Sequence, residues 1–572
     1  MNSRKIFLKV LNLGPKRSRS RFFQLALLHI LVSFTDLLSI AFLVSLMAAA
    51  IKGDRVEYLK ESINGYGAWS LETGTILLVL ALFSFILFAA KNLLGYKVAK
   101  GSLHFARDFS AHLSTQLVEA FYNRGFSYLR NEKIFKITHR TASLPFEFAS
   151  VTLKSVLSII AQVAVCVAFL IFSFTLDPAI ATILLLGALP VIGIMYFRHK
   201  QKAVKFGQEK NKKLPSNNRE LHKLYESFVE LKIYGAKDLF VQKFLHHLNG
   251  FNAVRFKQQL LTIYPRRVLE TVAIGLIVGL FSYRILMSGG PDAFIIDLLV
   301  LGVFGYKVIP ALANIMDGTV VLNTTRDAQL SLLENLESET PAVQAGNISE
   351  FQELSFKNVS FGIGGTPVLI NANLYLKKGD ILGIVGRSGE GKSTLLKLFM
   401  GLLQPDSGQT SVNGDETTLY NNEQWMRKLG FIDADSTMLD MSIYENVSLR
   451  KANMNQNKSQ IEDALSLAGL TEFIGADRSV GEDGKALSSG QKQRLALARA
   501  LYHKPSVLVL DEFTSHLDEE TEHVILDTIE RISHTQQTTV LMVSHRKSAI
   551  GIANKVFEVR NKRLIQVGQE QS

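Results

Sequence analysis

Residues 381–400 read ILGIVGRSGEGKSTLLKLFM, an apolar strand followed by a glycine-rich loop and a helix-like run. The loop fits the pattern G-x-x-x-x-G-K-[ST], with Gly386, Gly391, Lys392 and Ser393 in register. Glycines let backbone N–H groups converge on phosphate oxygens, and the start of the following helix adds a favourable partial charge. The stretch therefore predicts a P-loop in which Lys392 reaches the terminal phosphates and Ser393 ligates Mg²⁺. The other residues of the predicted phosphate cradle are Ser388, Gly389 and Thr394.

Apolar residues are spread unevenly along the 572 residues of the chain. The mean hydropathy of +0.16 is high for a soluble enzyme, and the long apolar runs lie before about residue 320. The remainder has the charge density of a water-soluble α/β domain. We therefore expect a transmembrane domain at 1–320, a polar linker at 321–350 and a nucleotide-binding domain at 351–572.

The N-terminal segment is basic and precedes an apolar stretch that reaches about residue 50, longer than the core of a signal peptide. This pattern predicts an uncleaved first span with a cytoplasmic N-terminus. Five further runs are each near the ~20 residues needed to cross a membrane, which gives six spans in all. These runs are about 75–105, 149–175, 178–198, 268–287 and 294–318.

The connections between spans predict the orientation of the chain. Lys and Arg are frequent in 97–140 and 198–223, which places both segments in the cytoplasm. Six spans then return the chain to the cytoplasm, so both termini are expected there, and a bacterial inner membrane is the predicted location. The segment 52–74 is either a short amphipathic helix on the outer surface or a solvated loop.

The basic connections also carry more apolar and aromatic residues than a solvated connector needs. We expect helices there that extend the spans and touch the soluble domain. The residues concerned are Phe121, Phe126, Tyr128, Leu129, Phe228, Ile233, Tyr234 and Phe240.

A formal charge of +12 raises the question of a nucleic-acid partner. The basic residues lie beside apolar spans instead of forming a stripe on a soluble domain, so we expect membrane lipid and no nucleic acid as a partner. Cys166, the single cysteine, lies in an apolar run and excludes an intrachain disulfide.

Three more motifs follow the P-loop. Residues 487–491 read LSSGQ, and the aliphatic run 507–510 ends in Asp511 and Glu512. A buried strand that ends in two acids suits Asp511 as a Mg²⁺ ligand and Glu512 as the group that polarises the attacking water. A second aliphatic strand ends at His545.

In this order the motifs resemble those of the ATP-binding cassette (ABC) family. The resemblance implies a polytopic α-helical membrane domain, with six spans and cytoplasmic extensions, fused to a P-loop α/β ATPase. It also implies that His545 touches the γ-phosphate of ATP, that 515–518 is the D-loop, and that 480–484 is the exporter-type segment. The segment 487–491, here called the signature segment, would cap ATP bound to the P-loop of a second cassette. Its contacting residues are Ser488, Ser489, Gly490 and Gln491.

Two positions depart from the family pattern. Ile363 stands where an aromatic residue usually stacks on adenine, so base stacking must be weaker or come from elsewhere. Ala434 stands where a glutamine usually approaches Mg²⁺ and the attacking water. Either Asp433 or Asp435 substitutes for that glutamine, or hydrolysis is slow or coupled differently.

One cassette and six spans resemble an exporter-type half-transporter, which hydrolyses ATP with Mg²⁺ and couples hydrolysis to transport. Both halves of the ATP site lie in this chain, so a second copy is the simpler partner and a related half-transporter is the alternative. An ATP-gated membrane protein that does not pump is a further alternative.

The charged residues inside the spans bear on the substrate. Lys91, Arg266 and Lys307 are candidate cavity residues, and their excess of positive charge favours an anionic or amphiphilic anionic substrate. The alternative is that cations lie at helix ends or pair with Asp36 and Glu270. A looser resemblance, to PglK-type flippases, implies a lipid-linked oligosaccharide as substrate. Export of peptides or hydrophobic drugs is the competing hypothesis.

Overall fold

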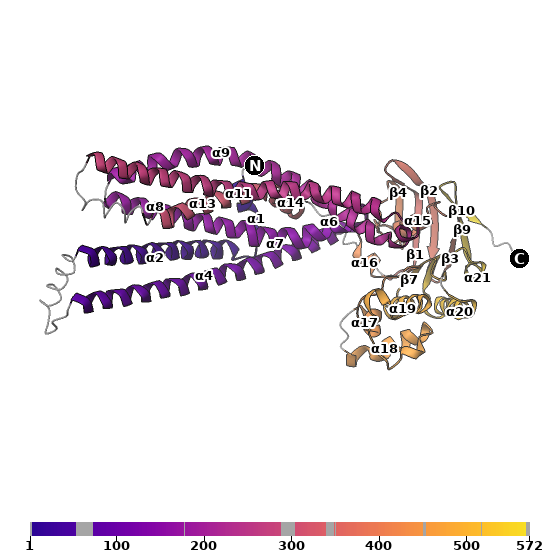
Figure 1. The fold of residues 1–572 in the computed structure, drawn as a ribbon. Helices are drawn as coiled ribbons and strands as arrows, with labels where there is room; N and C mark the ends of the chain where they lie inside the picture. Colours follow the sequence, from indigo (N-terminus) through magenta and orange to yellow (C-terminus); the bar gives the residue numbers. More distant parts are fainter. Residues whose placement is uncertain are drawn as a thin grey trace. The chain divides into compact units, whose positions relative to one another are not determined.

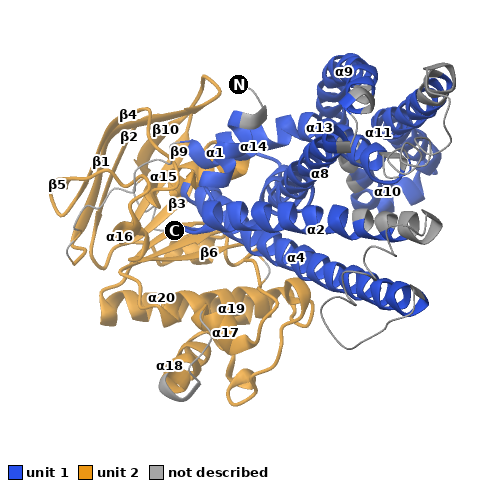
Figure 2. Cartoon of the chain, turned by 90° about the vertical axis from the view of Figure 1, so that its left-hand side faces the viewer, with its two compact units in different colours: residues 1–123, 132–339 blue, residues 124–131, 340–572 orange. Residues whose placement is uncertain are grey.

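The computed structural model describes residues 3–52, 73–176, 178–287, 302, 304–338, 348, 350–449, 454–515 and 517–567. Its chain divides into two compact units, coloured separately in Figure 2. Unit 1 comprises residues 1–123 and 132–339, and unit 2 comprises 124–131 and 340–572. Most of the segment 52–74 and part of the run 294–318 lie outside the described residues.

Unit 1 is built of helices. The α-helices are α1 (Ser3–Asn12), α2 (Ser18–Lys52), α4 (Thr73–Asn123), α6 (Ile134–Thr138), α7 (Leu144–Glu147), α8 (Lys154–Leu176), α9 (Pro178–Glu226), α10 (Phe228–Ile233), α11 (Lys237–Met287), α13 (Ile309–Thr324) and α14 (Arg326–Glu337). Three short π-helical stretches interrupt them: η1 (His139–Ser143), η2 (Phe148–Leu153) and η3 (Phe304–Val308).

Three of these helices are far longer than a membrane crossing requires (Figure 1). Helices α4, α9 and α11 have 51, 49 and 51 residues. At ~1.5 Å per residue each is about 75 Å long, more than twice the ~30 Å hydrocarbon core of a bilayer. The predicted extensions of the spans are therefore helical, and the basic segment 198–223 is part of α9 rather than a loop.

Four helical segments among the described residues are long and apolar enough to cross a membrane. They are Ser18–Ser39, Gly74–Asn123, Ile134–Thr175 and Ala181–Lys213. The predicted fifth span, 268–287, forms the end of α11 but is not among these four.

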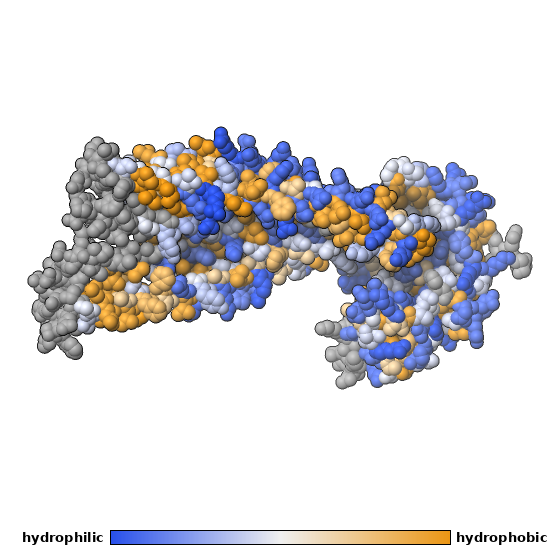
Figure 3. Space-filling view, viewed as in Figure 1, coloured by the Kyte–Doolittle hydropathy of each residue, from blue (hydrophilic) through white to orange (hydrophobic). Residues whose placement is uncertain are grey.

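The apolar side chains of unit 1 are divided between its interior and its surface. Small clusters join neighbouring helices, such as Phe169, Ala273 and Val308 of α8, α11 and η3. Other large apolar side chains point outward, including Phe85 and Leu93 of α4, which are 71% and 65% exposed. Figure 3 shows hydrophobic residues gathered on α2 and α4 toward the ends near residues 52 and 73. Such an apolar exterior is expected of helices solvated by lipid.

Unit 2 contains two sheets. The antiparallel sheet has the order β2-β1-β4-β5, and the other has the order β10-β9-β3-β8-β7-β6. The strands are β1 (Glu353–Ile363), β2 (Thr366–Lys377), β3 (Ile381–Val385), β4 (Ser407–Val412), β5 (Asp415–Glu416), β6 (Leu429–Asp433), β7 (Val507–Asp511), β8 (Thr539–Val543), β9 (Lys555–Arg560) and β10 (Arg563–Val567). In the second sheet, β9, β3, β8, β7 and β6 pair in parallel, and β10 pairs antiparallel with β9. The central strands β3, β7 and β8 are almost wholly buried, as their continuous aliphatic sequences require.

The helices of unit 2 pack on these sheets. They are α15 (Lys392–Phe399), α16 (Glu423–Met426), α17 (Ile443–Ser448), α18 (Met454–Leu467), α19 (Ser489–Tyr502), α20 (Glu519–Gln536) and α21 (Lys547–Gly551), with α5 (Gly125–Asn131) from the N-terminal half of the chain. Phe126 of α5 packs against the same apolar core as β3 and α15, and the Lys397 ammonium lies 5.5 Å from its ring centre. The predicted contact of Phe126 with the soluble domain is therefore confirmed.

Candidate site at the carboxyl ends of the parallel strands

The strand order brings together motifs that are far apart in the sequence. Strand β8 pairs with β3 on one side and β7 on the other, and β7 pairs with β6. Asp433, Asp511 and Val543 occupy matching positions at the ends of three neighbouring strands. Because parallel strands end at one edge, the P-loop, Asp511, Glu512 and His545 meet there. Ligands of open α/β sheets bind at this edge.

The P-loop has a backbone that only glycine adopts without strain. Gly386, Gly389 and Gly391 have φ values of 147°, 82° and 109°. A Cβ atom on Gly386 would lie 2.6 Å from the carbonyl oxygen of Val559, so no side chain fits there. The Lys392 ammonium is buried in the loop, where it donates to the carbonyl oxygens of Gly386 (2.8 Å) and Arg387 (3.0 Å).

Asp511 and Ser393 form the part of the site that suits a divalent cation. The Ser393 hydroxyl, at the start of α15, lies close enough to the Asp511 carboxylate to influence its ionisation. Burial raises the pKa of Asp511, and the nearby carboxylates of Asp433 and Glu512 raise it further, while the Ser393 hydroxyl opposes this rise. Hydroxyl and carboxylate oxygens surrounded by further carboxylates suit Mg²⁺. When bound, Mg²⁺ would neutralise part of the negative charge on the phosphates of a nucleotide. The described residues contain no cluster of three or more His, Cys, Asp or Glu that would hold a metal without a nucleotide.

Glu512 and His545 face each other across β7 and β8. The His545 Nε2 atom lies 3.4 Å from a carboxylate oxygen of Glu512, and the two side chains are 52% and 46% exposed. Glu512 has a φ of 51°, unusual for a residue other than glycine, and its N–H donates to the carbonyl of Val543 at 3.0 Å. This backbone turn points the carboxylate out of the sheet edge, within reach of a water molecule.

The signature segment caps the start of α19. The Ser488 hydroxyl accepts from the Gln491 N–H (3.2 Å), and the Gln491 side chain accepts from the Ser488 N–H (3.0 Å). Such a capping box leaves other N–H groups of the first turn free for an anion. Among the described residues, no hydrogen bond joins Ser488–Gln491 to the P-loop, so the chain by itself does not bring these two halves of the predicted ATP site into contact.

The two departures from the family pattern have clear structural settings. Ile363, at the end of β1, is 50% exposed and offers a branched aliphatic side chain instead of the flat face of an aromatic ring. Ala434 follows Asp433 at the end of β6, and its carbonyl accepts from the Gln493 side chain at 3.3 Å. Asp433 is the acid that lies beside Asp511, so of the two acids that flank Ala434 it is the better placed to substitute for a glutamine.

A groove of about 370 Å³ lies beside Ala434, with polar and apolar side chains in its lining. Its lining joins the segment after β6 to the segment before α19 and the first turn of α19. The lining residues are Ala434, Asp435, Ser436, Thr437, Met438, Asp483, Leu487, Ser489 and Lys492.

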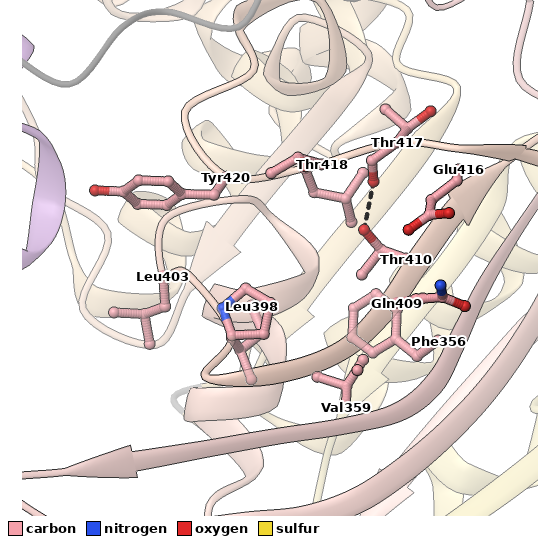
Figure 4. A pocket seen from close by; sticks show the side chains of 13 residues that line it. Phe356, Val359, Leu398, Leu403, Gln409, Thr410, Glu416, Thr417, Thr418 and Tyr420 are labelled. Carbon is pink, nitrogen blue, oxygen red and sulfur yellow. Dashed lines mark hydrogen bonds between the residues drawn. The ribbon is translucent and has the colours of Figure 1, made fainter.

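The pocket in Figure 4 is separate from this site. It has a volume of about 80 Å³, with Phe356 and Val359 on one side and Thr417 and Thr418 on the other. None of its lining residues is among the predicted site residues. It adjoins α5, because the Tyr420 hydroxyl lies 3.8 Å from where a Cβ atom of Gly125 would stand.

The charged residues of the predicted substrate cavity in unit 1 are paired. The Lys91 and Lys307 ammonium groups contact different carboxylate oxygens of Asp36, which joins α2, α4 and η3. Arg266 lies 3.2 Å from Glu270 on the same helix, where Arg267 also binds Glu270 at 3.1 Å. The predicted alternative of pairing with Asp36 and Glu270 is therefore present. The Asp36 group has one cation more than it has acids. Arg266 also interacts electrostatically with Asp317, so the arginine group has as many acids as cations.

Sequence reasoning did not find a second set of polar residues behind the site. Gln493, Arg546 and Glu522 are hydrogen-bonded to the segment that follows Glu512 or to one another. Gln493 and Arg546 each lie next to or near a predicted motif, and that proximity is the only local signal. Glu522 is 3% exposed in an acidic first helical turn, which by sequence indicates only a helix start.

Comparisons with known proteins agree with this geometry. Residues 369–515 match the family model described as ABC transporter. The chain is 35% identical over 277 residues to the leukotoxin translocation ATP-binding protein LktB of Mannheimia glucosida, covering 45% of this chain and 39% of that protein. It is 40% identical over 216 residues to the alpha-hemolysin translocation ATP-binding protein HlyB of Escherichia coli O157:H7, covering 36% and 30%. The matched segments thus span less than half of these relatives.

The fold is similar over nearly the whole chain to a solved bacterial Atm1-family ABC exporter with ATP bound. The TM-score is 0.78 at 19% sequence identity, with 96% of this chain and 95% of the other covered. The predicted fold class, helical spans joined to a P-loop α/β domain, is confirmed. The chain thus contains an ABC transporter domain and has the fold of an ABC exporter.

Proposed function

We propose that this protein is an ATP-driven membrane exporter of the half-transporter type. The observation that carries the proposal is the meeting of the P-loop, Asp511, Glu512 and His545 at the ends of β3, β7 and β8. These are the parts that phosphoryl transfer to water requires: a phosphate cradle, a metal ligand and a group that orients water. Four apolar segments of membrane-spanning length among the described residues support transport as the use of the energy.

Each residue has a role in this reaction. The P-loop, residues 386–394, holds the phosphates with its backbone N–H groups and the Lys392 ammonium. Ser393 and Asp511 hold Mg²⁺, and Glu512 polarises the attacking water. His545, next to Glu512, donates to the γ-phosphate and keeps it in line with the water. To bind phosphate, the Lys392 ammonium exchanges its hydrogen bonds to the carbonyls of Gly386 and Arg387 for hydrogen bonds to phosphate oxygens.

The complete site needs a second chain. Ser488–Gln491 stand apart from the P-loop within one chain, so they are available to cap a nucleotide held by a partner. A homodimer is the simplest arrangement, since this chain carries both halves. We place the dimer in a bacterial inner membrane with both termini cytoplasmic, the transmembrane domain at 1–320, the linker at 321–350 and the nucleotide-binding domain at 351–572.

The substrate is proposed to be an anionic amphiphile, such as a lipid-linked oligosaccharide. Lys91 and Lys307 share the single carboxylate of Asp36, so this group keeps one unmatched positive charge. A phosphate or pyrophosphate head group would neutralise that charge.

Export of a peptide or protein is the second candidate. It is favoured by the similarity to LktB and HlyB, which are named as leukotoxin and alpha-hemolysin translocation ATP-binding proteins. A peptide substrate would not need the unmatched charge of unit 1.

ATP hydrolysis by the purified full chain in lipid nanodiscs tests these alternatives. A polyprenyl-pyrophosphate oligosaccharide and a short amphipathic peptide are added separately, with Glu512→Gln as the blank. Stimulation by the glycolipid alone is expected, and stimulation by the peptide alone would favour the second candidate. Hydrolysis no faster than the blank would instead support an ATP-gated protein that does not pump.

A further inference from the structure

The side chain of Arg546, directly after His545, is aimed back into unit 2. Its Nη1 atom pairs with the carboxylate of Glu522, and its Nη1 and Nη2 atoms donate to the carbonyl of Leu517 at 3.4 and 3.3 Å. Nη2 also reaches the carbonyl of Ser515 at 3.5 Å. One guanidinium thus contacts two points of the segment that follows Glu512.

Glu522 is a rigid anchor for this guanidinium. Its side chain is only 3% exposed, and its second carboxylate oxygen accepts from the Ser548 hydroxyl at 2.7 Å. A buried carboxylate that lost its cation would be strongly destabilising, so Glu522 and Arg546 hold each other in place. The pair joins the first turn of α20 to the residues after β8.

The segment after Glu512 is held from a second side by α19. Gln493, 4% exposed, donates from its side-chain amide to the Ser515 hydroxyl at 3.3 Å. The Ser515 N–H in turn donates to the carbonyl of Glu512 at 3.2 Å. The backbone that positions the Glu512 carboxylate is therefore fixed between Gln493 and Arg546.

We propose that Arg546 is a positioning residue for ATP hydrolysis, which holds the backbone at Ser515 and Leu517 so that Glu512 stays opposite His545. The proposal rests on the proposed function, because it assigns a role within that reaction. His545 and Arg546 are adjacent, so a guanidinium fixed on Leu517 and Ser515 also fixes the distance between His545 and Glu512. The planar fork of arginine contacts two carbonyls and a carboxylate together, which a single lysine ammonium does not reproduce.

The test is Arg546→Lys in the full chain in nanodiscs, with kcat, KM for ATP and thermal unfolding measured together. Lysine keeps the charge beside Glu522 but loses the fork. We expect kcat per folded molecule to fall about 10-fold with KM within about twofold, since a small misplacement of reacting groups lowers turnover and not nucleotide binding. Arg531→Lys, an exposed site on α20, is the matched control and should behave as wild type.

Glu522→Gln is the second variant, in case the lysine variant folds poorly. It preserves the shape and an acceptor for Arg546 but removes the charge, so we expect a smaller fall in kcat, about threefold, again without a change in KM. Turnover within twofold of wild type in Arg546→Lys would overturn the proposal. So would a loss of activity that only matches the loss of folded protein in both variants.

The double variant Glu512→Gln with Arg546→Lys separates this inference from the proposed function. If Arg546 acts through Glu512, adding Arg546→Lys lowers residual hydrolysis no further than Glu512→Gln alone. A wild-type rate equal to that of Glu512→Gln would instead show that the proposed hydrolysis is absent. An additional 10-fold fall in the double variant would contradict the inference alone.

Discussion

Charged side chains are treated in opposite ways by the two units. In unit 1, Lys91 is 9% exposed and shares the carboxylate of Asp36 with Lys307, so one of the two positive charges is compensated inside the protein. In unit 2, Glu512 and His545 are about half exposed at the open end of the sheet. A low-dielectric environment makes an unpaired charge costly, whereas an aqueous sheet edge leaves charges available to a ligand. Charged residues therefore indicate a reactive site only in unit 2. In unit 1, the positive charge that Asp36 leaves uncompensated is what bears on the substrate.

The largest expected effect is on Glu512. Glu512→Gln removes the base but keeps the shape, and we expect a fall in ATP hydrolysis of about 10²- to 10⁴-fold with little change in nucleotide affinity. Measured turnover and ATP binding on the same preparation check this. A variant that retained a tenth of the wild-type rate would show that the exposed Glu512–His545 pair is not the reacting pair.

Asp511 should give two opposite effects. Asp511→Asn removes a metal ligand, so Mg²⁺-dependent hydrolysis should fall by about 100-fold or more. Thermal stability without nucleotide should rise at neutral pH. The pKa of Asp511 is raised above that of an ordinary aspartate, so its ionisation opposes folding, and that part of the stability is lost as pH rises through the raised pKa.

Thermal unfolding at several pH values separates these contributions. The stability gain of Asp511→Asn over wild type should vanish below the ordinary range of carboxyl pKa values, where both the folded and unfolded chains are protonated. A gain that grew toward acid pH would contradict the electrostatic explanation.

In unit 1, breaking the shared ion pair should reduce stability. Asp36→Asn leaves Lys91 and Lys307 beside each other, at a cost of about 3 kcal/mol. Adding Lys91→Met restores a single excess positive charge and should recover most of the loss. Thermal unfolding in nanodiscs measures both. Equal stability of Asp36→Asn and wild type would show that Lys91 and Lys307 are hydrated, as the exposed Glu512 and His545 side chains of unit 2 are.

The smallest expected effect is at Ala434. Ala434→Gln adds a side-chain amide near Asp433 and Asp511. If this amide makes one net hydrogen bond in the transition state, turnover should rise about fivefold. Asp435→Asn, at an exposed neighbouring position, is the control. An unchanged rate would show that Asp433 already fills this role or that the position does not contribute.

Local sequence patterns predicted the parts of the site but not their neighbourhood. The P-loop, Asp511–Glu512 and His545 each follow a short aliphatic strand, which predicts a strand end whatever the order of the strands. That β8 lies between β3 and β7, and so brings His545 beside Glu512, depends on packing across the whole sheet. The pairing of Asp36 with Lys307, 271 residues apart, depends on the same kind of long-range packing. The π-helical turns η1 and η2 also leave no clear mark in residue periodicity.

Helix α5 has a consequence for the order in which the protein is made. It belongs to unit 2, yet residues 132–339 are synthesised between it and the rest of that unit. At about 5–20 residues per second, Phe126 leaves the ribosome roughly 10–40 s before the first strands that will bury it. The contact of Phe126 with the core of the ATPase unit therefore cannot form until the helices between them in the sequence have been synthesised.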